Sequence, residues 1–119
     1  MDNVPGALCL YQWDGHQLET LACSNQFHEI VGCDRAQAYE NTQKLLTDHV
    51  HPADLEQLRD AMKGVLHRGE AADCVFRVFH GMKQDYVWLR MQTNTKLQPD
   101  GSQRIFALYT DQTELRTSL

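Results

Sequence analysis

Hydrophobic and polar residues alternate along both ends of the chain, a period-two pattern that predicts β-strands. The segments 7–13 and 17–23 flank Asp14-Gly15-His16, whose residue types favour a tight turn, so we expect an opening hairpin. Turn-rich segments separate three more strand-like stretches near the end of the chain, at 74–79, 86–93 and 104–110. Short connections of this kind join antiparallel neighbours.

The middle of the chain has helical spacing instead. The clearest helix begins at Pro52, which suits a first helical position because it has no N–H to leave unpaired, and it ends before Gly69. One stripe of this helix is apolar and the opposite side is polar. The apolar stripe consists of Leu55, Leu58, Met62, Val65 and Leu66, and the polar side of Glu56, Arg59, Asp60 and Lys63.

Shorter helical segments are predicted between the hairpin and the long helix. Ser24 is a candidate N-cap for a helix that ends at Gly32, and Asp34 for a second one. The apolar residues of these segments are Phe27, Ile30 and Val31 in the first, Ala36, Ala38 and Tyr39 in the second, and Leu45 and Leu46 in a third.

This order of elements predicts an α+β fold, in which helices gather on one face of a five-stranded antiparallel sheet. The 119 residues form one domain, 1–119, and the net charge of -5 disfavours a nucleic-acid surface, which is normally basic. No apolar run approaches the ~20 residues that span a membrane, and the first residues lack the pattern of a signal peptide. We therefore expect a cytoplasmic segment without membrane contact.

The stretch HVHPADL at 49–55 offers ligand types that bind zinc, because it holds His49, His51 and Asp54. The same residues fit the entry to the long helix, where Pro52 holds the preceding residue extended and a carboxylate is favoured in the first turn. With Asp54 accounted for by the helix start, the His49-x-His51 pair could still put both rings on one side, but a third and fourth ligand at matching spacing are missing from the sequence. We expect the helix entry and no metal site.

The four cysteines, Cys9, Cys23, Cys33 and Cys74, contain no C-x-x-C pair. Cys9 and Cys23 stand in strand-like text, where a reduced cysteine serves as a small buried hydrophobe. We expect no disulfide framework.

Two of the last three strands are apolar on both faces. Alternation places one set on the side of the helices, namely Val87, Leu89, Met91, Ile105, Ala107 and Tyr109. It places another set on the outer side, namely Tyr86, Trp88, Phe106 and Leu108. The helices cover only one face, so we expect a flanking segment or a second subunit, in a homodimer, to cover the other. The alternative is that these aromatic side chains stay exposed.

Three stretches of the chain resemble, in order and spacing, a PAS domain of the bacterial signalling type. SNQFHEIVGCD is similar to the family's asparagine-x-x-phenylalanine segment, with Ser24 in place of asparagine, and VHPADLEQL is similar to its histidine-proline-x-aspartate helix entry. The segment from Phe76 to Glu114 resembles the final three strands, including Trp88 and the closing Asp111-Gln112-Thr113. The resemblance covers nearly the whole chain.

The resemblance implies a sensory or dimerising module in a longer signalling protein. Such domains usually precede a histidine kinase, a diguanylate cyclase (GGDEF) or a cyclic-di-GMP phosphodiesterase (EAL), and they pass their state along a helix that leaves the last strand. Asp111 and Thr113 would begin this relay, with 111–119 as the start of the linker. Gln112 replaces the usual apolar residue, which we expect to weaken the anchoring of the junction.

The sequence argues against two cofactors that the family can carry. A photoactive flavin domain needs a cysteine just before the long helix, where this chain has ENTQKLL, and Cys33 lies earlier. A haem domain would use a histidine of the long helix, and His67 is predicted to point roughly 150° away from the apolar stripe. We expect neither a flavin adduct nor haem.

A small ligand could lie between the helices and the inward sheet face. Its predicted lining is Val87, Leu89, Met91, Ala107 and Tyr109, although these residues also fit a plain core. Only Tyr109 offers a polar group.

We therefore expect a regulatory PAS module that binds a small ligand or a partner. A ligand-free dimerisation or protein-interaction domain is the alternative. A small enzyme is a third hypothesis, and His28-Glu29 and His80 are its nearest candidate catalytic residues. No known catalytic motif contains them, and we predict no intrinsic catalysis.

Overall fold

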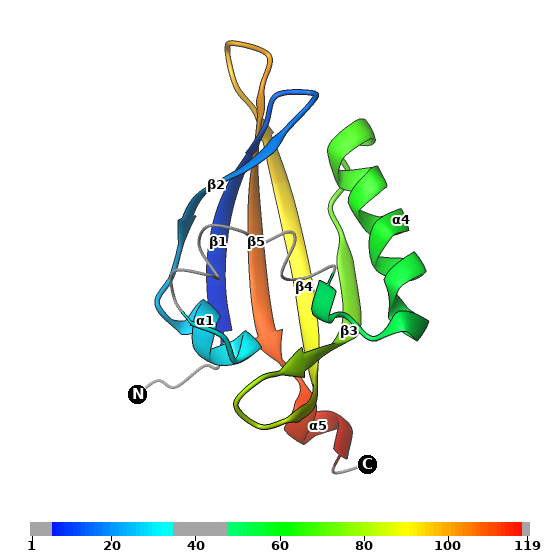
Figure 1. Ribbon diagram of the computed structural model, residues 1–119. Helices are drawn as coiled ribbons and strands as arrows, with labels where there is room; N and C mark the ends of the chain where they lie inside the picture. Colours follow the sequence, from blue (N-terminus) through cyan, green and yellow to red (C-terminus); the bar gives the residue numbers. More distant parts are fainter. Residues whose placement is uncertain (1–5, 35–47, 118–119) are drawn as a thin grey trace.

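Five antiparallel strands and a small number of helices make up the computed structural model, which describes residues 6–34 and 48–117. The α+β fold predicted from the sequence is confirmed (Figure 1). The elements are β1 Gly6–Trp13, β2 Leu18–Cys23, α1 Gln26–Val31, α4 Pro52–Arg68, β3 Asp73–His80, β4 Asp85–Leu97, β5 Gln103–Asp111 and α5 Thr113–Thr117. The predicted helix from Asp34 and the segment with Leu45 and Leu46 fall outside the described residues.

The strands are ordered β2-β1-β5-β4-β3, so the two ends of the chain meet in the middle of the sheet. β1 pairs with β5 along the whole length of β1, from Gly6↔Thr110 to Trp13↔Gln103. On its other side β5 pairs with β4, which runs to Leu97. The predicted strand stopped at 93, because the next residues, Asn94, Thr95 and Lys96, are all polar and continue no apolar alternation. The C-terminal end of β5 therefore lies beside the first part of β4, and α5 follows it directly.

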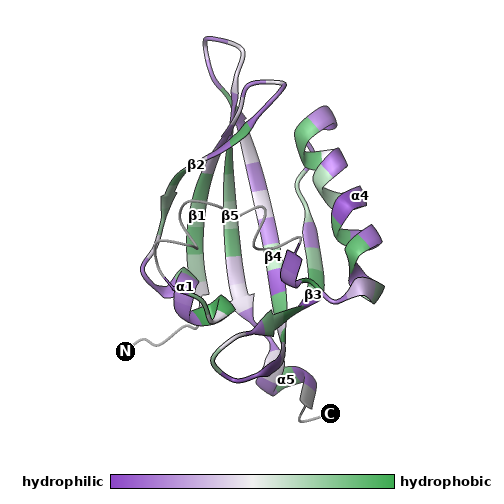
Figure 2. Ribbon diagram, viewed as in Figure 1, coloured by the Kyte–Doolittle hydropathy of each residue, from purple (hydrophilic) through white to green (hydrophobic). Residues whose placement is uncertain are grey.

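The core lies between the inward sheet face and the helices. Phe27 of α1 and Leu58 and Val65 of α4 are buried against inward strand residues such as Phe76 and Leu89. Apolar stretches of β1, β5 and α1 appear green in Figure 2, whereas the hairpin tips are polar. Within the described ranges, no helix combines the length and apolar character that crossing a bilayer requires.

Both ends of α4 agree with the sequence. Pro52 opens the helix, and the Nδ1 atom of His51 accepts a hydrogen bond of 3.0 Å from the Ala53 N–H. Gly69 closes it in the left-handed conformation, with φ 64°. Asp54, in the first turn, accepts hydrogen bonds from the Arg77 guanidinium and backbone N–H at 2.8–2.9 Å. The HVHPADL stretch therefore joins the helix start to the edge strand β3.

The start of α1 differs from the prediction. Gly32 ends this helix in the left-handed conformation as expected, with φ 71°. The N-cap, however, is Asn25, and Ser24 does not cap the helix. Ser24 instead bonds Leu8 of β1. Its Oγ accepts a hydrogen bond of 3.0 Å from the Leu8 N–H, and its own N–H donates one of 2.8 Å to the Leu8 carbonyl. The hairpin thus takes the hydroxyl that the helix was expected to use.

Candidate functional site

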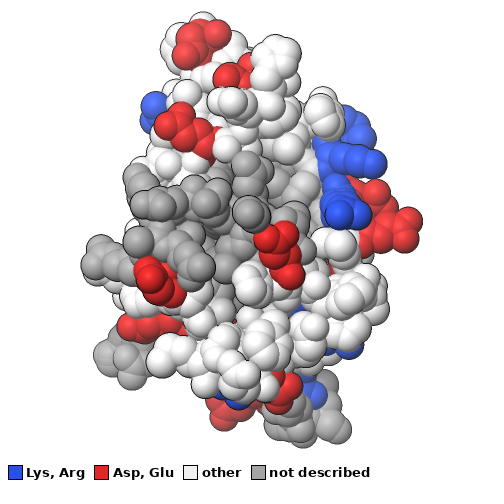
Figure 3. Space-filling view, viewed as in Figure 1, with Lys and Arg blue, Asp and Glu red and all other residues white. Residues whose placement is uncertain are grey.

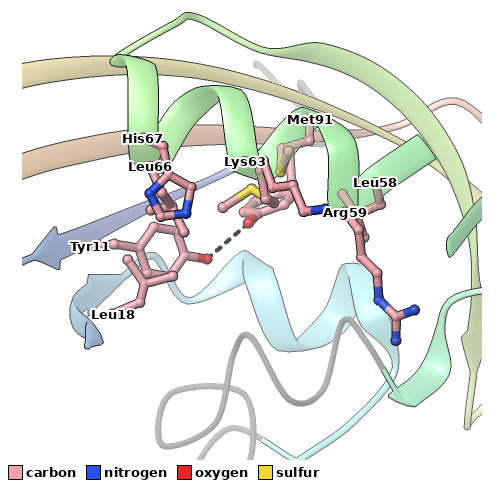
Figure 4. A pocket seen from close by; sticks show the side chains of 10 residues that line it. Tyr11, Leu18, Leu58, Arg59, Lys63, Leu66, His67 and Met91 are labelled. Carbon is pink, nitrogen blue, oxygen red and sulfur yellow. Dashed lines mark hydrogen bonds between the residues drawn. The ribbon is translucent and has the colours of Figure 1, made fainter. Parts of the chain in front are cut away.

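A cavity of about 280 Å³ lies between α4 and the inward face of the sheet (Figure 4). Its volume is near the lower end of the range for small-molecule sites. Helix α4 contributes one wall, and four strands contribute the other. The lining residues are Tyr11, Leu18, Leu58, Arg59, Met62, Lys63, Leu66, His67, Met91 and Tyr109.

Two of the five residues predicted to line a ligand site, Met91 and Tyr109, line this cavity. Val87, Leu89 and Ala107 face inward as expected but are packed in the core, each at most 1% exposed. The predicted lining named only residues of β4 and β5, so it lacked the residues of α4 and the part of the wall that comes from β1 and β2. Only the strand order, which places β1 next to β5, brings that part to the cavity.

The polar feature of the cavity wall is a pair of tyrosine hydroxyls. The Tyr11 and Tyr109 hydroxyl oxygens are 2.9 Å apart, and Figure 4 shows the bond between them as a dashed line. Burial raises the pKa of the Tyr11 phenol and that of the Tyr109 phenol well above the ordinary tyrosine value. Tyr109 also packs against Phe27, with 5.1 Å between ring centroids. The pair stays neutral and presents hydroxyl groups to an otherwise apolar space.

The basic residues of α4 correct the helical-wheel prediction. Arg59 and Lys63 were expected on the side opposite the apolar stripe, and His67 was expected to point away from the cleft, yet all three line the cavity. The His67 ring lies edge-on to Trp13, with 6.0 Å between centroids. All three side chains are exposed, as expected of a polar side. Residues of a helix are about 100° apart, so Arg59 and Lys63 follow Leu66 around the helix and border the apolar stripe, not the side opposite it. Because α4 packs on the edge strand β3, this border faces β1 and β2 across the cavity.

The predicted outer sheet face is partly open. Tyr86, Phe106 and Leu108 are 38%, 39% and 41% exposed, and Leu8, which pairs with Leu108, is 50% exposed. Trp88 is half-buried instead, because guanidinium groups approach its ring. The Arg77 and Arg116 groups lie 4.9 and 5.2 Å from the ring centroid.

The two predicted relay residues form a compact junction after β5. The Asp111 carboxylate accepts from the Thr113 N–H at 2.8 Å, and the Thr113 hydroxyl accepts from the Trp88 N–H at 2.9 Å. The Gln112 N–H donates to the Trp88 carbonyl at 2.7 Å, through its backbone and therefore independently of its side chain. The start of α5 is tied to the backbone of Trp88, near the beginning of β4.

His80, considered above as a candidate catalytic residue, is buried and hydrogen-bonded to the backbone of two other segments. It is 5% exposed, with its Nε2 atom 2.9 Å from the Glu29 carbonyl oxygen and its Nδ1 atom accepting from the Lys83 N–H at 3.1 Å. These bonds join α1 to the β3–β4 turn. Among the described residues, no group of three or more His, Cys, Asp or Glu side chains could hold a metal ion.

The cysteines are free thiols in the structure. Cys9 donates a hydrogen bond to the Cys23 sulfur at 2.9 Å, and this bond together with burial raises the pKa of Cys9 far above its ordinary value. Burial also raises the pKa of Cys33, and that of Cys74 to about 11. Protonated thiols of this kind are weak nucleophiles.

A family model described as PAS fold matches residues 20–107. The chain belongs to the PAS family. Solved structures with the same fold include a domain of a putative light and redox sensing histidine kinase from Haloarcula marismortui, with 24% identity, TM-score 0.67, and 87% of this chain and 88% of that chain covered. The N-terminal domain of a diguanylate cyclase with PAS/PAC sensor from Marinobacter aquaeolei has 14% identity, TM-score 0.74, and coverage of 92% and 98%.

A sensory box histidine kinase/response regulator from Burkholderia thailandensis is similar as well, with 20% identity, TM-score 0.66, and coverage of 93% of this chain and 81% of that chain. No curated protein matches the chain significantly. The similarity therefore establishes the PAS fold, and the function has to be argued from the cavity and the junction.

Proposed function

We propose that this PAS domain is a regulatory module that binds a small molecule between α4 and the sheet. The observation that carries the proposal is the cavity itself, whose surface is mainly apolar and which has the Tyr11–Tyr109 hydroxyl pair in its wall. An apolar space with a small number of fixed polar groups is the usual form of a small-molecule site. The similar domains from a histidine kinase and a diguanylate cyclase support a role in signalling.

The sheet offers a route from the cavity to the end of the domain. Met91 and Tyr109, which line the cavity, are paired across β4 and β5, and the next inward pair in the register is Leu89↔Asp111. Asp111 in turn bonds Thr113, which holds α5 to Trp88. We infer that a ligand against Met91 and Tyr109 shifts these strands and thereby the start of α5. An output domain in the same parent chain, located in the cytoplasm, would read this change.

The proposal assigns the domain no reaction of its own. The ring nitrogens of His80 are already engaged with the Glu29 carbonyl and the Lys83 N–H. The thiols of Cys9, Cys33 and Cys74 have raised pKa values. A flavin adduct, which the sequence argues against, is not part of the proposal. His67 lines the cavity, so its direction no longer argues against haem, and no role for haem is proposed.

Native mass spectrometry of freshly purified protein tests ligand binding. We expect extra mass that survives gentle desolvation and is lost on denaturation. Met62→Trp fills the cavity and should remove this mass, whereas Met82→Trp, a matched change at a residue that is 81% exposed, should retain it. An adduct held equally by the Met62→Trp protein would show that the molecule binds elsewhere.

A second role, homodimerisation through the outer sheet face, is favoured by its exposed apolar residues Leu8, Phe106 and Leu108. This surface would serve a ligand-binding module as well as a ligand-free interaction domain. A dimer without any adduct would favour the second of these.

A further inference from the structure

Helix α4 presents two parallel ridges to the cavity. Leu58, Met62 and Leu66 form an apolar ridge at four-residue spacing, and the residues that follow them form a basic ridge. The basic ridge consists of Arg59, Lys63 and His67. Residues four positions apart lie above one another on a helix, so the three basic side chains run along the length of the apolar wall.

The polar ends of this ridge lie at the rim of the cavity. Arg59, Lys63 and His67 are exposed, while their stems lie along the wall, as is usual for long basic side chains on an apolar surface. In Figure 4 the His67 ring lies beside Tyr11, and the Arg59 guanidinium extends away from the hydroxyl pair. The site thus has an apolar interior, a hydroxyl pair in its wall and positive charge at its mouth.

Arg59 and Lys63 are the two cationic side chains of this ridge, and neither is paired with an acidic side chain in the described part of the chain. The acidic residues of α4 do not line the cavity. Asp54 is committed to Arg77. Figure 3 shows Lys and Arg side chains together over one part of α4, with Asp and Glu side chains next to them, on a protein whose net charge is -5. A locally positive mouth on an acidic protein favours an anionic ligand.

We infer that the cavity takes an amphipathic monocarboxylate, such as a medium-chain fatty acid, with its apolar body against Met62, Leu66 and Met91. Its carboxylate lies at the mouth against Lys63 and Arg59. The inference rests on the proposed ligand-binding function and names the class of ligand. The volume of about 280 Å³ excludes a large ring system but accommodates a short flexible chain.

Isothermal titration calorimetry with decanoate, decanol and decylammonium, all below their micelle concentrations, tests this assignment. Decanoate should bind more tightly than decanol, and only its affinity should fall as salt is added. Lys63→Met should weaken decanoate binding by about fivefold or more, the effect of losing one charge-assisted contact at a partly exposed site, and should leave decanol unchanged. Lys83→Met, in the β3–β4 turn and away from the cavity, is the matched control and should change neither affinity.

Charge reversal makes the test symmetric. Lys63→Glu should weaken decanoate binding and strengthen decylammonium binding, which a change in folding or in cavity volume would not do. Equal binding of decanoate and decanol, unaffected by either Lys63 variant, would overturn the carboxylate assignment and leave ligand binding intact. Failure of all three probes to bind would also overturn it, while an endogenous adduct in native mass spectrometry would show that the proposed function stands with another ligand class.

Discussion

The Thr113 hydroxyl accepts a hydrogen bond of 2.9 Å from the Trp88 N–H, which fixes the first residue of α5 to the middle strand of the last three. The two residues are 25 positions apart in the chain. Because Gln112 bonds the carbonyl of the same Trp88, both backbone groups of one residue hold the exit of the domain.

Replacing Thr113 by valine should loosen this exit. The change keeps the shape of the side chain but removes the acceptor, so the Trp88 N–H loses its partner at a cost of about 1–2 kcal/mol. We expect faster hydrogen exchange at the Trp88 amide and through α5. Thr113→Ser retains the hydroxyl and should behave like the native protein, and equal exchange in the valine variant would show that the bond does not hold the helix.

The Asp54–Arg77 pair should make stability depend on pH in the acidic range. Hydrogen bonds from Arg77 lower the pKa of Asp54, whose side chain is only 12% exposed. A lowered folded-state pKa contributes stability above the unfolded carboxyl value of about 3.9, and this contribution is lost as the pH falls through the folded value. Asp54→Asn should therefore destabilise the domain by about 2 kcal/mol at neutral pH and by less in acid.

Urea unfolding of the native and Asp54→Asn proteins across this pH range measures the difference. Asp73→Asn is the matched control, because the Asp73–Arg90 pair has the same chemistry but side chains that are 53% and 39% exposed. Its effect should be much smaller. A difference between native and Asp54→Asn protein that did not change with pH would contradict the role given to this carboxylate.

Gly32 should tolerate a side chain far less well than Gly69, although both end a helix in the left-handed conformation. A Cβ on Gly32 would overlap the His80 ring, whereas one on Gly69 would meet nothing within 4 Å. Gly69→Ala should cost about 1 kcal/mol through its backbone conformation. Gly32→Ala should cost about 1–3 kcal/mol more through overpacking against the His80 ring. Thermal unfolding measures both variants, and an equal loss of stability in the two would contradict the close contact between Gly32 and His80.

The outer sheet face should govern self-association. Sedimentation equilibrium should show a dimer whose dissociation constant rises at least about tenfold in Phe106→Ser and Leu108→Ser, since apolar residues at the centre of an interface dominate its affinity. Met82→Ser changes an exposed apolar residue outside this face and should leave the dimer intact. A native protein that sediments as a monomer would contradict the proposed dimer.

Periodicity was sufficient to predict the strands and α4, because each buries one face and therefore carries a regular apolar pattern. Pro52 and Gly69 fixed the ends of α4 for local reasons, since the backbone conformation at each depends on the residue itself. Ser24 was assigned the wrong partner, because its hydroxyl could bond either α1 or β1 and only the fold decides between them.

The cavity depended on relationships that periodicity does not contain. Tyr11 and Tyr109 meet because β1 pairs with β5, a contact between the two ends of the chain. The position of Arg59 and Lys63, by contrast, was available from the sequence, because about 100° per residue places them beside Leu66 and not opposite the apolar stripe. The spacing of Arg59, Lys63 and His67 was also visible and marks a continuous face of α4.

Hydrogen exchange measured by mass spectrometry on ligand-loaded and ligand-stripped protein tests the central claim that cavity occupancy is coupled to the exit of the domain. The account predicts that loading changes exchange both around Met91 and Tyr109 and at Trp88 and α5, through the shared strands β4 and β5. Exchange that changes only around the cavity and leaves Trp88 and α5 unaltered would contradict it.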